Sequence, residues 1–151
     1  MATNQNETLV RRFFDEMCNQ RKLNVADELF TANHVYHDPQ APTGPGPDGV
    51  KQVISTYQNA FPDAHWHVEE TIVADNVIIT RWKGTGTHKK ELNGIPPTGK
   101  SVEVQGIWIH RFANNKIVES RNVWDTLGML QQLGVVPVTG KVAEESIAGK
   151  N

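Results

Sequence analysis

The stretch SVEVQGIWIHRF, residues 101–112, alternates between two kinds of side chain. Its even positions are the more apolar ones, and strict alternation is typical of a β-strand with one buried face. We therefore expect Trp108 and His110 to face inward, and Ile107 and Ile109 to face outward. Because a soluble monomer rarely exposes such aliphatic residues, we expect a second copy to cover the outer face, which predicts a homodimer.

Three neighbouring stretches, 64–74, 77–88 and 116–124, are rich in Val, Ile, Thr and Trp, and they predict further strands. Asp75-Asn76 and Asn114-Asn115 separate consecutive strands and suit tight hairpin turns, because Asn tolerates a positive φ. The sequence therefore predicts an antiparallel meander of four strands.

Apolar residues at helical spacing predict three helices before the strands, over 7–17, 25–30 and 48–61. A last helical turn or two over 127–133 ends at Gly134. Helices followed by a meander give an α+β fold, with three N-terminal helices packed on one face of a curved sheet. Such a sheet tends to leave a cavity in which a small molecule binds.

The length of 151 residues fits one domain, which we expect over 1–137, followed by a flexible polar tail over 138–151. A formal charge of -2 gives no reason to expect nucleic acid or an anionic membrane as the principal partner. No apolar run approaches the roughly 20 residues of a membrane span. The single cysteine, Cys18, and a polar N-terminus predict a cytoplasmic protein.

The most suggestive acid is Asp125, which shares its strand phase with Arg121. A carboxylate beside Trp124 and Trp108 would be desolvated, and desolvation raises its pKa toward the range useful for general acid–base catalysis. Asp125 also suits the N-cap of a helix beginning at Thr126. The residues alone leave both interpretations open.

Histidines form two further clusters, His34 and His37 with Asp38, and His65 with His67. A metal site needs three or four converging donors, and spacing supplies only two histidines in each cluster, so we predict no metal site. His37 is either a pocket residue or a surface histidine that bonds the turn after it.

Arg121 lies two residues from Glu119 on the last predicted strand. An arginine in a pocket could orient a substrate or lower the pKa of a neighbouring carboxyl, whereas the plainer interpretation is an ion pair along the strand. Arg121 and Asp125 also supply two members of an Asp-Arg-Asp set that would hold a water in an epoxide hydrolase.

An ordered series of motifs runs through most of the chain: YHDP at 36–39, GPGPDGV at 44–50, AFPD at 60–63, GTGTH at 84–88, LNGIPPTGK at 92–100, GIWIHRF at 106–112, KIVE at 116–119, and WD at 124–125 leading into QLG at 132–134. This series resembles the SnoaL-like polyketide cyclase family, the ester-cyclase branch of the nuclear-transport-factor-2-like superfamily.

The resemblance implies a cone-shaped α+β barrel, dimeric or tetrameric, with one apolar pocket. It further implies intramolecular aldol condensation of a polyketide without metal or cofactor, with an aspartate at the position of Asp125 as acid and base. Trp108 occupies the position of the family's pocket histidine, and Gly106 replaces a polar residue. An indole N–H donates a hydrogen bond but relays no proton.

The leading hypothesis is a cofactor-independent cyclase or isomerase acting on a hydrophobic keto compound. Asp125 and His110 are its candidate catalytic residues, and Trp108 and His110 would polarise the substrate oxygen. The candidate substrate-binding residues, besides Trp108, are His37, Tyr36, Arg121 and Trp124. The alternatives are a non-catalytic small-molecule binder and an epoxide-hydrolase-like enzyme on the same fold.

Overall fold

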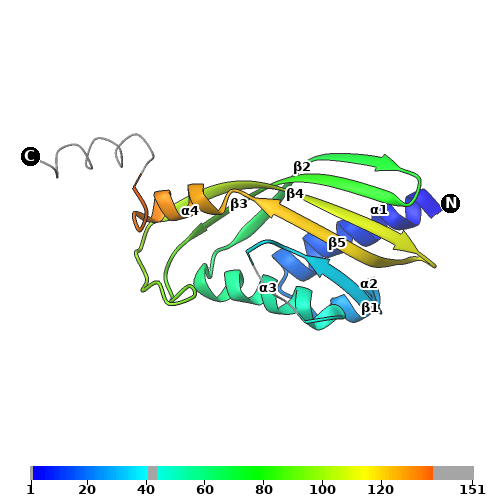
Figure 1. The fold of residues 1–151 in the computed structure, drawn as a ribbon, viewed down its shortest axis with the longest axis horizontal. Helices are drawn as coiled ribbons and strands as arrows, with labels where there is room; N and C mark the ends of the chain where they lie inside the picture. The colour runs from blue at the N-terminus through cyan, green and yellow to red at the C-terminus, as the bar shows by residue number, and fades with distance from the viewer. Residues whose placement is uncertain (1, 41–43, 138–151) are drawn as a thin grey trace, which may run out of the picture.

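The computed structural model describes residues 2–40 and 44–137, so the expected tail at 138–151 lies outside the described residues. Helical segments and strands follow one another in the order shown in Figure 1. The helical segments are α1 (Ala2–Arg12), η1 (Phe13–Asn19), η2 (Leu23–Val25), α2 (Ala26–Leu29), α3 (Pro47–Ala60) and α4 (Thr126–Leu133). The strands are β1 (Phe30–His37), β2 (His65–Ala74), β3 (Val77–Thr87), β4 (Ser101–Ala113) and β5 (Lys116–Trp124).

The four predicted strands form the antiparallel meander β2-β3-β4-β5, which confirms the α+β class. A fifth strand, β1, was not predicted, and it pairs in parallel with β5. The expectation of a purely antiparallel sheet is therefore wrong. The signal was weak because the residues that β1 buries in its second half are His34 and Tyr36, so the strand lacks a clear apolar alternation. β1 and β2 are the two edges, and the sheet is not closed into a barrel.

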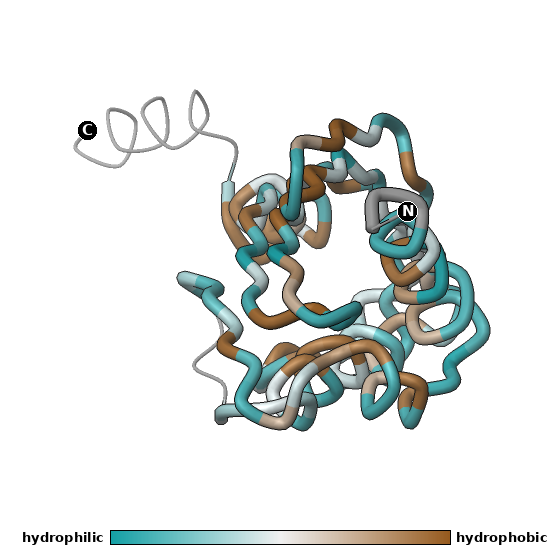
Figure 2. The backbone as a smooth tube through the Cα atoms, turned by 90° about the vertical axis from the view of Figure 1, so that its right-hand side faces the viewer, coloured by the Kyte–Doolittle hydropathy of each residue, from teal (hydrophilic) through white to brown (hydrophobic). Residues whose placement is uncertain are grey.

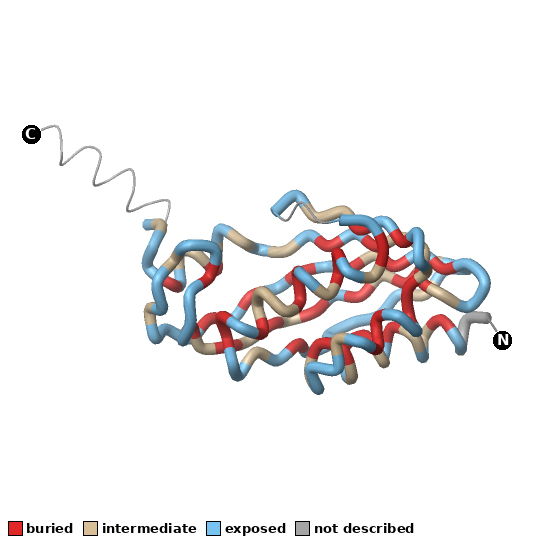
Figure 3. Tube along the Cα trace, turned by 90° about the horizontal axis from the view of Figure 1, so that it is seen from below, coloured by how far each residue is buried: buried red, intermediate tan, exposed pale blue. Residues whose placement is uncertain are grey.

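The helical segments contribute buried side chains to the same core as the sheet. α1 continues directly into the π-helical η1, whose buried Phe13, Phe14 and Met17 meet the inner side of the sheet, and α3 buries Val53 and Ile54. Figure 2 shows hydrophobic and hydrophilic positions interleaved along the backbone, and Figure 3 shows buried positions recurring along the strands. No described helix combines the length and the apolar character needed to cross a membrane.

The alternation expected for β4 is confirmed, because Trp108 and His110 are buried while Ile107 lies on the outer face. The alternation expected for β5 is wrong. Phe112 pairs with Ile117 but Arg111 pairs with Glu119, so Val118 is one extra residue, a β-bulge. A shift of one residue turns every later side chain to the opposite face.

An apolar strip crosses the outer face of the sheet. Ile107 is paired with Val123, and the two side chains are 44% and 63% exposed; Ile72, 51% exposed, is paired with Ile79 on the neighbouring strand. Exposed aliphatic side chains in adjacent strands are the feature from which the homodimer is predicted.

The homodimer is tested by light scattering at micromolar concentration. We expect a mass of twice 16.9 kDa for the natural chain. Ile107→Lys should shift the mass to that of one chain, because a charge in an apolar contact is costly to desolvate. Leu127→Lys, at a similarly exposed position on α4, is the matched control and should leave the mass unchanged. A natural chain that scatters as a monomer contradicts the prediction.

Candidate functional site

A cavity lies between α3 and the inner face of the sheet, and all four tryptophans of the chain, Trp66, Trp82, Trp108 and Trp124, line it. Its empty space totals about 560 Å³ including the mouth, and the centre of a water-sized molecule can occupy about 60 Å³ of it. The small second volume indicates a narrow space. Concave, mostly apolar spaces with a few polar groups are the usual sites of small-molecule binding.

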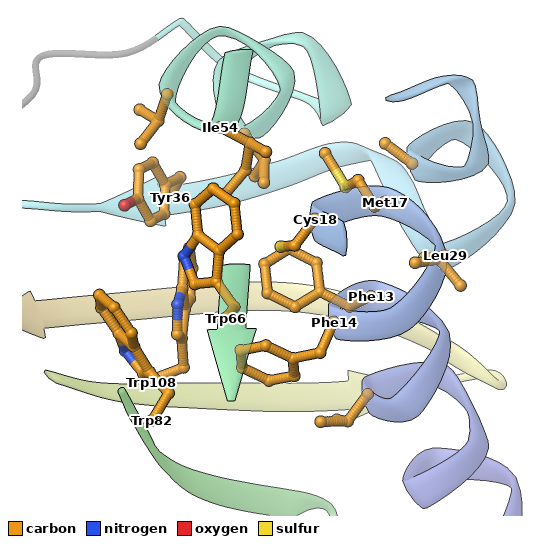
Figure 4. Packing of buried hydrophobic residues seen from close by; sticks show 14 of the residues in the cluster. Phe13, Phe14, Met17, Cys18, Leu29, Tyr36, Ile54, Trp66, Trp82 and Trp108 are labelled. Atoms are coloured by element: carbon orange, nitrogen blue, oxygen red, sulfur yellow. The ribbon is translucent and has the colours of Figure 1, made fainter. Parts of the chain in front are cut away.

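The tryptophans approach one another because β4 carries no side chain between them. A Cβ atom at Gly106 would lie 2.5 Å from Cζ2 of Trp82 and 2.6 Å from Cβ of Trp124. The centroids of these two indoles are 6.4 Å apart, and Tyr57 of α3 meets Trp124 edge-on at 5.2 Å. The glycine therefore shapes an aromatic wall. Figure 4 shows the rings of Trp66, Trp82 and Trp108 close together, beside Tyr36 and Ile54.

A chain of hydrogen bonds forms the polar part of this wall. Trp82 donates from Nε1 to Oδ1 of Asn122 at 3.3 Å, and Asn122 lies near enough to Tyr36 to influence the pKa of its hydroxyl. Tyr36 donates its hydroxyl proton to Oδ2 of Asp38 at 2.7 Å. The backbone N–H of Gln40 donates to the other oxygen of Asp38 at 2.8 Å. The chain runs from the cavity wall to the half-buried end of β1.

The tyrosines beside the cavity keep their protons at neutral pH. Burial raises the pKa of Tyr36 well above its usual range, and the hydrogen bond to Asp38 raises it further. Burial and the negative charge of Asp38 raise the pKa of Tyr57 to about 12. Both hydroxyl groups are thus hydrogen-bond donors.

Trp108 stands at the centre of the buried aromatic side chains and is only 1% exposed. Its ring stacks on Tyr36 at 5.3 Å and on His110 at 5.2 Å. Its Nε1–H is buried and has no hydrogen-bond partner among the described residues. A buried N–H without an acceptor is rare and costly, so this donor lacks its usual partner.

Three of the predicted site residues lie where a ligand could be recognised. Trp108 and Trp124 line the cavity, and Tyr36 packs directly behind Trp108. Sequence reasoning missed Asn122 and Trp82 as site residues. Asn122 would have been found had the extra residue in β5 been recognised, because the corrected alternation places it on the inner face with Ser120.

His110, a predicted catalytic residue, is not at the cavity. It is fully buried next to Phe13 and Trp108, and neither ring nitrogen has a partner among the described residues. Burial, with a smaller effect of His34, lowers the pKa of His110 to about 3. His34 donates or accepts through Nε2 to Oγ of Ser120 at 2.8 Å, and burial lowers its pKa to about 4. Both imidazoles are neutral at pH 7 and shielded from a ligand.

His37 and Arg121 lie outside the cavity, contrary to the expectation that they bind substrate. Nε2 of His37 lies 3.1 Å from Oε2 of Glu119, whose other oxygen lies 3.3 Å from Nε of Arg111. Arg121 is exposed on β5. The bulge in β5 explains both positions, because it turns Arg121 outward together with Glu119, the partner of His37.

Asp125 is exposed, and the expectation of a desolvated carboxylate is wrong. Its Oδ1 accepts a hydrogen bond from the backbone N–H of Gly128 at 2.8 Å, so Asp125 is the N-cap of α4. The reason is again the phase of β5, which turns Trp124 toward the cavity and Asp125 away from it. Arg121 and Asp125 therefore provide no epoxide-hydrolase set inside the cavity.

The first histidine cluster separates in space, because His34 faces inward to Ser120 while His37 bonds Glu119 outside. His65 borders the cavity but is exposed, and its ring centroid lies 4.3 Å from that of His67, on the face of β2 opposite to the buried Trp66. Within residues 2–40 and 44–137, no group of three or more His, Cys, Asp or Glu side chains could hold a metal ion.

Comparison with known proteins agrees with the fold. A family model described as SnoaL-like polyketide cyclase matches residues 8–133. A protein from Jannaschia sp. CCS1 described as a SnoaL-like polyketide cyclase superposes with a TM-score of 0.81 at 22% identity, over 89% of this chain and 95% of that one. IdmH from Streptomyces antibioticus, described as a polyketide cyclase, gives 0.75 at 29%, over 86% and 99%. No curated protein matches the chain.

A further structure of the same fold carries a different description. AclR from Streptomyces galilaeus, described as a hydroxylase, superposes with a TM-score of 0.79 at 21% identity, over 89% of this chain and 99% of that one. The same scaffold thus carries different descriptions, and the residues of the cavity determine the reaction.

The buried histidines predict how stability depends on pH. Below about pH 6.5 an unfolded histidine takes up a proton, whereas His110 and His34 stay neutral down to about pH 3 and 4. The unfolded state then binds more protons, so the free energy of unfolding decreases as pH falls from 6.5 toward 4. His110→Phe should remove about one proton, or about 1.4 kcal/mol per pH unit, from that slope.

Urea unfolding between pH 7 and pH 4 measures this slope. His110→Phe should be at least as stable as the natural chain at pH 7, because it removes two unpartnered polar atoms from the core. His67→Phe, the same change at an exposed histidine whose pKa is lowered to a smaller extent, should reduce the slope by less than His110→Phe does. An unaltered slope in His110→Phe would show that His110 is protonated in the folded protein.

Proposed function

The chain belongs to the SnoaL-like polyketide cyclase family, and from this premise we propose that its cavity binds a flat, hydrophobic keto compound of the polyketide type. The observation that carries the proposal is the composition of the cavity wall. Four indoles with Tyr57 and Phe61 surround a narrow space. Aromatic walls bury large apolar areas and stack on planar rings, so they favour a flat, unsaturated ligand over a globular aliphatic one.

The polar groups at the cavity favour a carbonyl oxygen on that ligand. The indole N–H of Trp108 is buried without an acceptor, and Asn122 contributes an amide on the adjacent strand. Tyr57 adds a hydroxyl that is protonated at neutral pH. A keto oxygen accepts hydrogen bonds and donates none, so it matches such a set of donors.

The lining residues favour a binding site over a site of acid–base catalysis. None of the described residues that line the cavity is Asp or Glu. Tyr57 has a pKa of about 12, too high for a base at neutral pH, and Asn122 does not titrate. Small-molecule binding is therefore the function that the geometry supports best.

Binding is measured by quenching of tryptophan fluorescence, which is selective here because every tryptophan lines the cavity. We use 9-fluorenone, a flat aromatic ketone, as the probe. Val104→Phe should weaken its binding at least tenfold, because Val104 lines the cavity and a larger side chain fills the space. Val123→Phe makes the same change on the outer face and should leave the affinity unaltered. Equal affinities in the two variants would contradict binding in the cavity.

The second candidate function is ring closure of the bound compound by aldol condensation, and the N–H groups of Trp108 and Asn122 in the cavity wall favour it. His65 borders the cavity, and its imidazole, which lies against that of His67, would have to turn toward the cavity mouth to act as the base. It would take the proton next to one carbonyl while Trp108 and Asn122 stabilise the enolate oxygen. The enolate carbon then bonds to a second carbonyl carbon of the same molecule, and the proton returns to the new alkoxide.

Mass spectrometry and NMR of an aromatic keto ester incubated with the protein test this candidate. His65→Gln should reduce turnover at least 100-fold, as expected for loss of a general base, with little change in affinity. Asp125→Ala should keep turnover and cost about 1 kcal/mol of stability, because it removes only the cap of α4. Turnover that is lost in Asp125→Ala but kept in His65→Gln would overturn the assignment.

A further inference from the structure

The hydrogen-bond chain at the cavity has a fixed direction, because both of its ends act in one way only. An indole N–H donates and never accepts, so the atom of Asn122 that faces Nε1 of Trp82 at 3.3 Å must be its oxygen. A carboxylate accepts and does not donate, so the hydroxyl of Tyr36 must give its proton to Asp38 at 2.7 Å.

These two ends determine the bond between them. With its proton held by Asp38, the oxygen of Tyr36 has only lone pairs to offer to Asn122, so the amide nitrogen of Asn122 donates to it. The amide of Asn122 cannot flip without breaking both contacts.

With these directions fixed, the cavity wall still lacks acceptors for two of its N–H groups. The amide oxygen of Asn122 already accepts one bond and counts as satisfied, whereas its nitrogen retains a second N–H. The buried Nε1–H of Trp108 has no acceptor among the described residues. Trp108 and Asn122 are direct partners across β4 and β5, so both donors belong to one part of the wall. Unpaired buried N–H groups cost more than an unused carbonyl lone pair.

We propose that Asn122 determines the ligand specificity of the cavity by presenting a fixed N–H donor, and that Tyr36 and Asp38 are positioning residues that hold the amide in this orientation. The cavity then selects planar ketones and quinones over the same ring system without oxygen. It also selects them over the corresponding alcohol, whose oxygen can accept the bond but whose own O–H would lack an acceptor in the wall. This inference rests on the proposed binding function and names the substrate class of the same site.

Three compounds with one ring skeleton test the selection: 9-fluorenone, 9-fluorenol and fluorene. Binding of each to the full-length chain is followed by tryptophan fluorescence and calorimetry. We expect 9-fluorenone to bind about 10-fold or more tightly than fluorene and fluorenol, which corresponds to about 1.4 kcal/mol, within the range of one satisfied buried hydrogen bond.

Variants then separate specificity from packing. Asn122→Leu should abolish the preference for the ketone, and Asn122→Asp should favour fluorenol, because a carboxylate only accepts. Asp38→Asn should lower the ketone preference at least threefold while fluorene affinity stays the same. An amide at this position can also donate a hydrogen bond, so the hydroxyl of Tyr36 no longer points in one fixed direction. A merely structural role of Asp38 would change all three affinities together. Asn59→Leu, on the exposed side of α3, is the control.

Failure of the proposed binding function and failure of the role assigned to Asn122 give different experimental results. If none of the three compounds binds to the natural chain, the proposed function itself is overturned. If all three bind equally well, or if the ketone preference persists in Asn122→Leu, binding stands and the assigned role of Asn122 is overturned. Circular dichroism checks the fold of each variant, and Asp38→Asn carries the test if Asn122→Leu does not fold.

Discussion

A β-bulge at Val118 controls which side chains of β5 reach the interior. Ile117 faces inward before it, and the one extra residue then brings Ser120, Asn122 and Trp124 inward while Glu119 and Arg121 face solvent. Without that residue, the charged phase of the strand would point into the core, where unpaired charges are costly to desolvate. The polar wall of the cavity and the external position of Asp125 both follow from it.

The cavity also depends on the absence of a side chain at Gly106 of β4. Gly106 allows two indoles to approach over a position that any Cβ would fill, and Trp108 two residues later connects them to the stacked rings of Tyr36 and His110. An aromatic wall built in this way is rigid, because each ring is held by its neighbours at about 5 Å. Rigid walls reduce the entropy lost when a ligand binds.

The core carries a second group of polar side chains that does not line the cavity. His34 bonds Ser120, while His110 beside them has no partner among the described residues, and burial keeps both histidines neutral at pH 7. Such side chains resemble a catalytic set in the sequence, but their burial makes them sensors of acid through stability alone. Enclosure within the fold distinguishes them from His65, which is exposed beside the cavity.

The sequence by itself determined the meander, the class of the fold, the inward direction of Trp108 and the apolar outer position of Ile107, because alternation along a regular strand reports its two faces directly. It could not reveal β1, whose buried His34 and Tyr36 give no apolar signal, or the bulge, which depends on pairing with a neighbouring strand. Asp125 therefore caps a helix instead of entering the cavity, and Asn122, which the sequence analysis did not single out, lies at the cavity. Only the tertiary structure decides this, because the face a residue occupies depends on strand register, and register is set between strands and not within one.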